Sequence, residues 1–163
     1  LTLTVSYAHQ YVRIPDAVNP YPNVNGVIST LAVPVHQTYT PEDSASGSID
    51  YQLPLNGMTL RWHIDGNYDG GFYNTSSDPL YLGAGNPGNV YQLKSEKSFL
   101  VNGRFAVADI EMPNNGATVT VALWARNLFN EQHLFYRTVS ITSGVSGFFN
   151  EPRTWGGEIN VKF

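Results

Sequence analysis

Residues 155–163 read Trp155-Gly156-Gly157-Glu158-Ile159-Asn160-Val161-Lys162-Phe163 and alternate strictly between two kinds of side chain. Aromatic and aliphatic residues and Gly157 occupy the odd positions, whereas Gly156, Glu158, Asn160 and Lys162 occupy the even ones. A β-strand projects successive side chains to opposite sides. The segment is therefore predicted to be a strand with one face suited to an apolar medium and one face suited to water.

The same period of two recurs in five further segments, and the clearest of them spans residues 58–69. In that segment Leu60, Trp62 and Ile64 alternate with Arg61, His63 and Asp65 without a change of phase. The pattern is weakest in residues 99–111, where Leu100 and Ile110 fall on the polar side. The six predicted strands comprise residues 1–13, 44–53, 58–69, 99–111, 117–129 and 155–163.

Composition favours an all-β protein with a surface that is poor in charge. Only 13% of the 163 residues are charged, against roughly a quarter in typical soluble domains. The net charge of −4 and the absence of clustered basic residues argue against nucleic-acid binding. No run of about 18 apolar residues predicts a transmembrane helix, and the lack of cysteine excludes disulfides and thiolate metal sites.

The connections between the predicted strands alternate in length. Long connections span residues 14–43, 70–98 and 130–154, whereas residues 54–57 and 112–116 are short turns. Outer-membrane barrels have short periplasmic turns and longer external loops, and their strands need roughly 9–11 residues to cross the bilayer. The pattern predicts an antiparallel up-and-down transmembrane β-barrel segment. Aromatic residues near the strand ends, where interfacial girdles belong, are Tyr11, Tyr68, Phe72, Phe99, Phe129, Trp155 and Phe163.

Two motifs near the end of the chain resemble a known family. They are Ala125-Arg126-Asn127-Leu128-Phe129-Asn130-Glu131-Gln132, and Gly147-Phe148-Phe149-Asn150-Glu151-Pro152-Arg153-Thr154-Trp155-Gly156 followed by Phe163. The arrangement resembles the C-terminal end of TonB-dependent outer-membrane receptors, in which an Asn-Leu-Phe motif ends the penultimate strand and the last strand ends on Phe. The stretch from Thr40-Pro41-Glu42 to Tyr51 is also similar to that family. The resemblance covers all 163 residues, as the last six of the family's 22 strands.

The resemblance implies the C-terminal barrel portion of a receptor in the bacterial outer membrane. Such a receptor imports a scarce ligand, for example a ferric siderophore or another metal chelate, and the barrel wall carries out no catalysis and holds no cofactor. The implied partners are outer-membrane lipid, the remainder of the barrel, the N-terminal plug, the TonB system and the barrel-assembly machinery, which reads the terminal Phe163. Bacterial barrels begin at eight strands, so we expect six strands without a plug to be a piece of a larger barrel.

Ligand contacts are expected from the long loops and from the polar face. Arg61 and Arg104 both lie opposite the apolar face, as a barrel requires, because a lipid-facing Arg at the midplane costs about 2–4 kcal/mol. The candidates in the loops are Tyr73, Tyr81, Tyr91, Arg137, Phe148 and Phe149, and those on the lumenal face are Arg61, His63 and Arg104.

Other chemistry has weaker support in the sequence. Residues 83–88 match G-x-G-x-x-G but lie within a loop with no helical segment after them, so a dinucleotide site is not expected. Asp65, Asp69 and His63 share a strand face, which a polar lumen wall explains equally well. The four histidines are scattered without a metal-binding spacing, and no nucleophile motif is present.

Two alternatives to the transporter remain open at the level of sequence. The first is a soluble carbohydrate-binding β-sandwich, although connections in compact domains have a median of about 4–6 residues. The second is an outer-membrane enzyme that would use carboxylates and histidine in the external loops. The candidates for such an enzyme are Asp43, Asp78 and His36, and nothing in the sequence brings them together.

Overall fold

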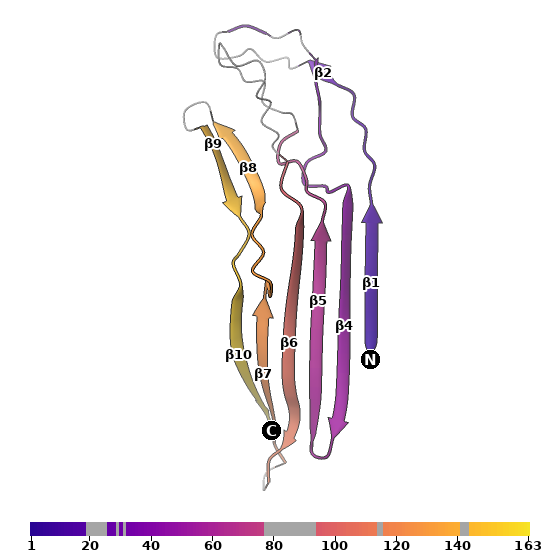
Figure 1. The fold of residues 1–163 in the computed structure, drawn as a ribbon, viewed down its shortest axis with the longest axis vertical. Coiled ribbons are helices and arrows are strands. Elements are labelled where there is room, and N and C mark those ends of the chain that lie inside the picture. Colours follow the sequence, from indigo (N-terminus) through magenta and orange to yellow (C-terminus); the bar gives the residue numbers. More distant parts are fainter. Residues whose placement is uncertain (19–25, 29, 31, 77–93, 114–115, 141–143) are drawn as a thin grey trace.

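The computed structural model describes residues 1–18, 26–28, 30, 32–76, 94–113, 116–140 and 144–163, and its main element is a six-stranded sheet (Figure 1). The strand order is β1-β4-β5-β6-β7-β10, and every neighbouring pair is antiparallel. Each of the six predicted segments overlaps one of these strands, and the described residues confirm the all-β prediction. The strands are β1 (Thr2–His9), β4 (Asp43–Leu55), β5 (Met58–Asp69), β6 (Ser98–Glu111), β7 (Thr118–Arg126) and β10 (Thr154–Lys162).

The short and long connections lie at opposite ends of the sheet (Figure 1). At one end, β4 and β5 are joined by Asn56 and Gly57 alone, and Gly57 has a positive φ of 78° that favours glycine. This turn is tighter than the predicted 54–57 turn, because Leu55 pairs with Met58 and the strands extend to the turn itself. The other end, called here the loop end, holds the strand ends that lead into residues 10–42, 70–97 and 127–153.

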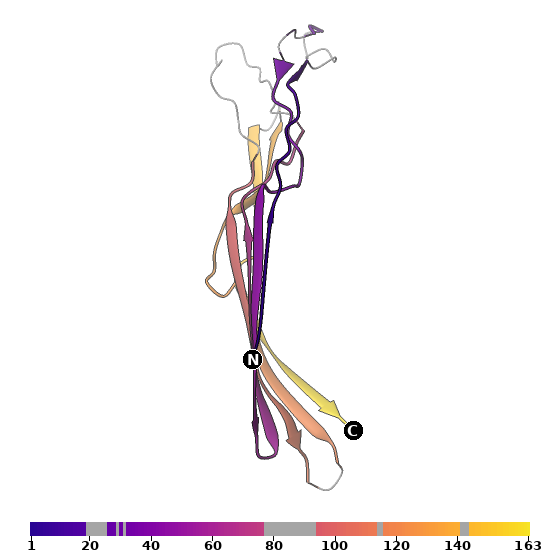
Figure 2. The ribbon, with the colours of Figure 1, turned by 90° about the vertical axis from the view of Figure 1, so that its right-hand side faces the viewer.

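Figure 2 shows the sheet from the side as a single curved layer. Its apolar face carries a row of aromatic side chains across three strands, in which Trp62 lies 5.5 Å from Tyr51 and 5.3 Å from Phe105 between ring centroids. Apolar side chains on this face remain exposed, including Leu123 at 63% and Ile159 at 73%. The sheet is not closed into a barrel, because β1 and β10 are its two edges.

The polar face holds the most buried part of the sheet. Ala106, Ala108 and Ala122 lie on this face of β6 and β7 and are at most 2% exposed. Long side chains such as Arg104 and Trp124 project from the same face beside them. On this face, long side chains therefore cover the small alanines and bury them although no second sheet among the described residues packs against the face.

A β-bulge in β6 changes the face that Ile110 occupies. The register shifts between Val107 and Ile110, so that Ile110 pairs with Val119, a residue of the apolar face. Asp109, at the bulge, has a positive φ of 56° and accepts a hydrogen bond of 2.5 Å from Arg61. The expectation that Ile110 lies on the polar side is therefore wrong, because one extra residue restores its phase. Leu100, paired with Asn67, stays on the polar side as expected.

The predicted strand boundaries need correction at the loop end. Residues 10–13 lie outside β1, and β7 ends at Arg126 because Asn127 adopts a left-handed backbone conformation with φ of 49°. The predicted long connection 130–154 holds two strands beyond the six that were predicted, β8 (Leu134–Ser140) and β9 (Gly144–Phe149), which pair with each other. A small two-stranded sheet also joins β2 (Ala17–Val18) and β3 (Ala32–Val33). No helix in the described ranges is long and apolar enough to span a membrane.

Gly156 leaves space on the polar face that the indole of Trp124 fills. A Cβ atom on Gly156 would lie 2.7 Å from Cζ2 of Trp124, whereas one on Gly157 would meet Leu123 and the backbone of Ala122 only at 3.7–3.8 Å. We expect Gly156→Ala to lower the free energy of unfolding by about 1–3 kcal/mol, because Trp124 must move. The measurement is urea unfolding followed by tryptophan fluorescence.

The matched control is Gly157→Ala, which places the same methyl group on the opposite face of the same strand. This variant should change the free energy of unfolding by no more than about 0.5 kcal/mol, as substitutions away from packed sites usually do. Equal losses in the two variants would contradict the contact between Trp124 and Gly156 as their cause.

Candidate functional site

Three of the predicted ligand residues lie close together at the middle of the polar face. His63 on β5 and Arg104 on β6 are direct cross-strand partners, and Arg61 lies two residues from His63 on the same face. The predicted grouping of Arg61, His63 and Arg104 therefore exists in the folded sheet. Their side chains are 36–43% exposed, so they are accessible from this face.

Each of these side chains has a carboxylate partner on another strand. Nδ1 of His63 is hydrogen-bonded to Asp50 on β4 at 2.7 Å. The guanidinium of Arg104 donates to Glu158 on β10 at 3.0 Å, and that of Arg61 donates to Asp109 on β6. The polar face is thus crossed by a ladder of charge pairs that leaves little uncompensated positive charge for an anionic ligand.

The carboxylates around His63 form a hydrogen-bonded network. Nε2 of His63 lies 3.4 Å from Oδ1 of Asp65, and the amide of Asn102 donates to the other oxygen of Asp65 at 2.8 Å. Across the part of the chain that the structure describes, no three His, Asp or Glu side chains are grouped so that they could hold a metal ion. The arrangement is suited to hydrogen bonding with a polar ligand or a polar protein surface.

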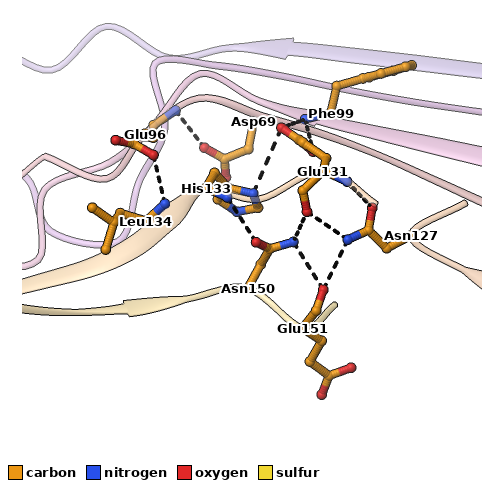
Figure 3. A network of polar contacts seen from close by, with 10 residues as sticks. Asp69, Glu96, Phe99, Asn127, Glu131, His133, Leu134, Asn150 and Glu151 are labelled. Carbon is orange, nitrogen blue, oxygen red and sulfur yellow. Dashed lines mark hydrogen bonds and ion pairs between the residues drawn. The ribbon is translucent and has the colours of Figure 1, made fainter. Parts of the chain in front are cut away.

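The hairpin β8–β9 is anchored at the loop end by two asparagines, one buried and one partly exposed (Figure 3). Asn127, which is 5% exposed, donates to the carbonyl oxygens of Glu131 and Glu151 and accepts from the backbone N–H of Glu131. Asn150 donates to the same two carbonyls and accepts from the N–H of His133. The asparagine of the Asn-Leu-Phe motif thus joins the end of β7 to the start of β8 and the end of β9.

Two glutamates attach this network to the strand that enters the sheet as β6. The carboxylate of Glu131 accepts from the backbone N–H of Phe99 at 3.0 Å. Glu96 accepts from the N–H of Leu134 and from the guanidinium of Arg137, each at 2.8 Å. Arg137, a predicted ligand residue, is therefore a structural partner of Glu96 as well as a surface group.

The remaining loop candidates are only partly placed. Phe148 and Phe149 on β9 are 60% and 61% exposed, and Phe148 packs against Tyr136 at 5.8 Å between ring centroids. Tyr81, Tyr91 and residues 83–88 lie outside the described residues. Of the residues considered for an enzyme, Asp78 also lies outside them, Asp43 accepts from the hydroxyl of Tyr7 and is hydrogen-bonded to His9, and His36 stacks on Tyr73.

Strand pairing continues past the loop-end limits of β1, β4, β5 and β6. The N–H of Gln10 donates to the carbonyl of Glu42 at 2.8 Å, in the register of β1 and β4. Tyr73 pairs with Lys94 in the register of β5 and β6. Gln10, Glu42 and the Tyr73–Lys94 pair therefore extend the polar face toward the loops.

A cavity of about 200 Å³ lies on this extension, called here the loop-end cavity. Gly71 lines it with no side chain, and its φ of 84° and a Cβ position only 2.7 Å from the Ser95 carbonyl oxygen exclude a larger residue. His36 stacks on Tyr73 with 3.6 Å between ring centroids and an angle of 2° between the rings. The lining residues are Gln10, Tyr11, Val12, Val35, His36, Gln37, Thr40, Glu42, Gly71, Tyr73 and Lys94.

Among the predicted ligand residues that the structure describes, Tyr73 is the one that lines this cavity. Asn74, which follows it, donates to the carbonyl of Arg137 at 3.4 Å, so the β8 hairpin lies close to the same segment. Sequence reasoning missed Gln10, Glu42 and Lys94 as site residues. These residues could be found by extending the strand register into the predicted loops. That register is set by pairing between segments distant in sequence, so the sequence alone did not reveal it.

Asn127→Gly should loosen the β8–β9 hairpin, because it removes three hydrogen bonds while keeping a residue that accepts a positive φ. Buried groups left without a partner cost about 1–3 kcal/mol. The expected result in the full-length protein is faster hydrogen exchange at the amides of Glu131 and His133. Asn130→Gly, which removes one bond to the N–H of Arg153, is the control and should have a smaller effect; equal protection in both variants would contradict the anchoring role.

Comparisons with known proteins leave the chain without an identified relative. No model of a protein family, no curated protein sequence and no solved structure matches it. The functional argument therefore rests on the residues and the geometry of the chain itself.

Proposed function

We propose that the chain is the C-terminal part of the barrel wall of a TonB-dependent receptor in the bacterial outer membrane, which imports a scarce ligand. One observation carries the proposal: the sheet has an uncovered apolar face and, on its other side, a polar face crossed by charge pairs. In the proposed barrel, hydrocarbon chains cover the first face and the water-filled lumen lies against the second. The family motifs near Asn127 and Phe163 add support from sequence.

The apolar face is too large and too exposed for an ordinary soluble surface. It extends over all six strands, from Leu3 and Val5 on β1, which are 67% and 75% exposed, to Ile159 on β10. Monomeric soluble proteins rarely expose apolar patches larger than a few hundred Å². Transfer of such a surface from water to hydrocarbon is favourable by about 25 cal/mol per Å².

The open edges at β1 and β10 support a larger barrel. In lipid, each unpaired backbone group costs several kcal/mol, so both edges require further strands. Because the six strands alternate in direction, the edge strands β1 and β10 run in opposite directions. An even number of additional strands would therefore close the sheet with antiparallel pairs throughout. The partners in the proposal are these strands, the plug, the TonB system and the assembly machinery.

The sandwich alternative has less support. It needs a second sheet over the apolar face, and the other sheets among the described residues are the β2–β3 pair and the β8–β9 hairpin, which lie beyond the loop end of the main sheet (Figure 1). The enzyme alternative would need its carboxylate and histidine in one place at the rim. Asp43 is instead engaged by Tyr7 and His9, and the proposal assigns the wall no catalysis.

Phe163 has the role of an assembly signal in this proposal. It follows β10 directly and is 92% exposed. An exposed terminal aromatic on an edge strand is accessible to the barrel-assembly machinery before the barrel closes.

Val121→Arg and Thr120→Arg test which face meets lipid. The two residues are adjacent at the same depth of β7, and Val121 lies on the apolar face whereas Thr120 lies on the polar face. In the full-length protein, Val121→Arg should destabilise the membrane-inserted barrel by up to about 2–4 kcal/mol and lower its amount in the outer membrane. Thr120→Arg should retain near wild-type abundance and heat-modifiable gel mobility; equal loss in both variants would contradict the assignment of the faces.

Energy-dependent uptake tests the function itself. Cells with and without the full-length gene are given ⁵⁵Fe-labelled hydroxamate and catecholate chelates and ¹⁴C-labelled neutral oligosaccharides. The proposal requires that at least one label accumulates only when the gene is present, and that a protonophore abolishes this accumulation. Uptake that persists after the proton-motive force is dissipated would argue for a passive pore instead.

A further inference from the structure

Residues from two extended strand pairs of the polar face line the loop-end cavity. Gln10 and Glu42 lie side by side through the extended pairing of β1 and β4, and Tyr73 lies opposite Lys94. Gly71 also lines the cavity, and its φ of 84° together with the nearby Ser95 carbonyl oxygen disfavours a larger residue there. The two strand pairs and the backbone of Gly71 therefore border one cavity.

The charges around the cavity are balanced. Lys94 supplies one ammonium group and Glu42 one carboxylate, while Gln10, Gln37 and Thr40 supply neutral donors and acceptors. A multiply charged ferric chelate would need an excess of positive charge, which the described residues of this lining do not supply. Hydroxyl groups, which both donate and accept, match a lining of amides, a hydroxyl and a carboxylate.

Aromatic rings complete the lining. Tyr11 is 76% exposed beside the cavity and supplies the accessible aromatic surface, whereas the ring of Tyr73 is stacked on His36 and has the ammonium of Lys94 over it, 5.8 Å from the ring centroid. Aromatic side chains offer rigid apolar surface against which the C–H face of a sugar ring packs. A pyranose has apolar C–H faces and hydroxyl groups around its edge. The aromatic surface matches the C–H faces, and the neutral hydrogen-bonding groups match the hydroxyls.

We infer that the loop-end cavity binds one sugar unit of a neutral oligosaccharide. The inference rests on the proposed function, which it deepens by naming the class of ligand. The cavity volume of about 200 Å³ is below the roughly 300–1,000 Å³ of pockets that bury whole drug-sized ligands, so it holds one ring of a longer chain. Because the cavity continues the polar face, the rest of the ligand lies toward the charge-pair ladder of the proposed lumen.

The test uses the full-length receptor in detergent and isothermal titration with defined probes. These are malto-, cello- and xylo-oligosaccharides of two to six units, a ferric tricatecholate and a ferric hydroxamate. We expect one of the oligosaccharide series to bind and both ferric chelates to fail. Gln37→Ala and Glu42→Ala, at exposed positions of the cavity, should each weaken oligosaccharide binding at least tenfold.

Gln52→Ala is the matched control, since Gln52 is an exposed glutamine on the polar face near the turn end, away from the cavity. It should leave the affinity within twofold of wild type, and heat-modifiable mobility reports that every variant is folded. Oligosaccharide binding that is insensitive to both cavity variants would overturn the site, and binding of a ferric chelate alone, or of no probe, would overturn the ligand class. None of these outcomes bears on the proposed function, which fails separately if uptake does not require the proton-motive force.

Discussion

Backbone pairing in a single continuous register is the constraint on which the structure depends. Because side chains alternate along each strand, keeping the same phase across six strands places most apolar side chains on one side and most charged ones on the other. A slip of one residue in any strand would move Ile64 or Val121 to the polar side and Arg61 or Arg104 to the apolar side. The bulge at Val107–Ile110 is the place where the register changes, and it keeps Ile110 on the apolar face.

The polar face is organised by charge pairs between strands that are distant in sequence. Arg104 meets Glu158 and Arg61 meets Asp109, and both pairs are partly exposed. Exposed pairs contribute about 0–1 kcal/mol each, so they add little to stability. Their larger consequence is electrostatic, because a face that carries its own counter-charges attracts neither anions nor cations strongly. This balance agrees with the neutral ligand inferred for the loop-end cavity.

At the loop end, several of the described residues continue the pairing of the sheet. Asn127 and Asn150 share the carbonyls of Glu131 and Glu151, and this sharing holds the β8–β9 hairpin against the ends of β7 and β10. On the other side, the Tyr73–Lys94 pair extends the β5–β6 register. The motif that suggested the family thus has a local mechanical role, since its asparagine closes the connection between two strands.

The sequence by itself determined the all-β class, the six main strands, the two faces and the end at which the long connections lie. It did so because the period of two, the turn residues and the spacing of the connections are local properties of the chain. It also placed Arg61, His63 and Arg104 on one face, since their positions keep one phase. These predictions needed no knowledge of which strand pairs with which.

The tertiary structure alone decided the partners. It decided that Asp109 sits in a bulge beside Arg61, that residues 134–149 form a hairpin, and that Gln10, Glu42, Tyr73 and Lys94 surround one cavity. Each of these depends on hydrogen bonds between segments far apart along the chain. Such bonds follow from how whole strands pair. The alternation of side chains within one strand does not specify its partner.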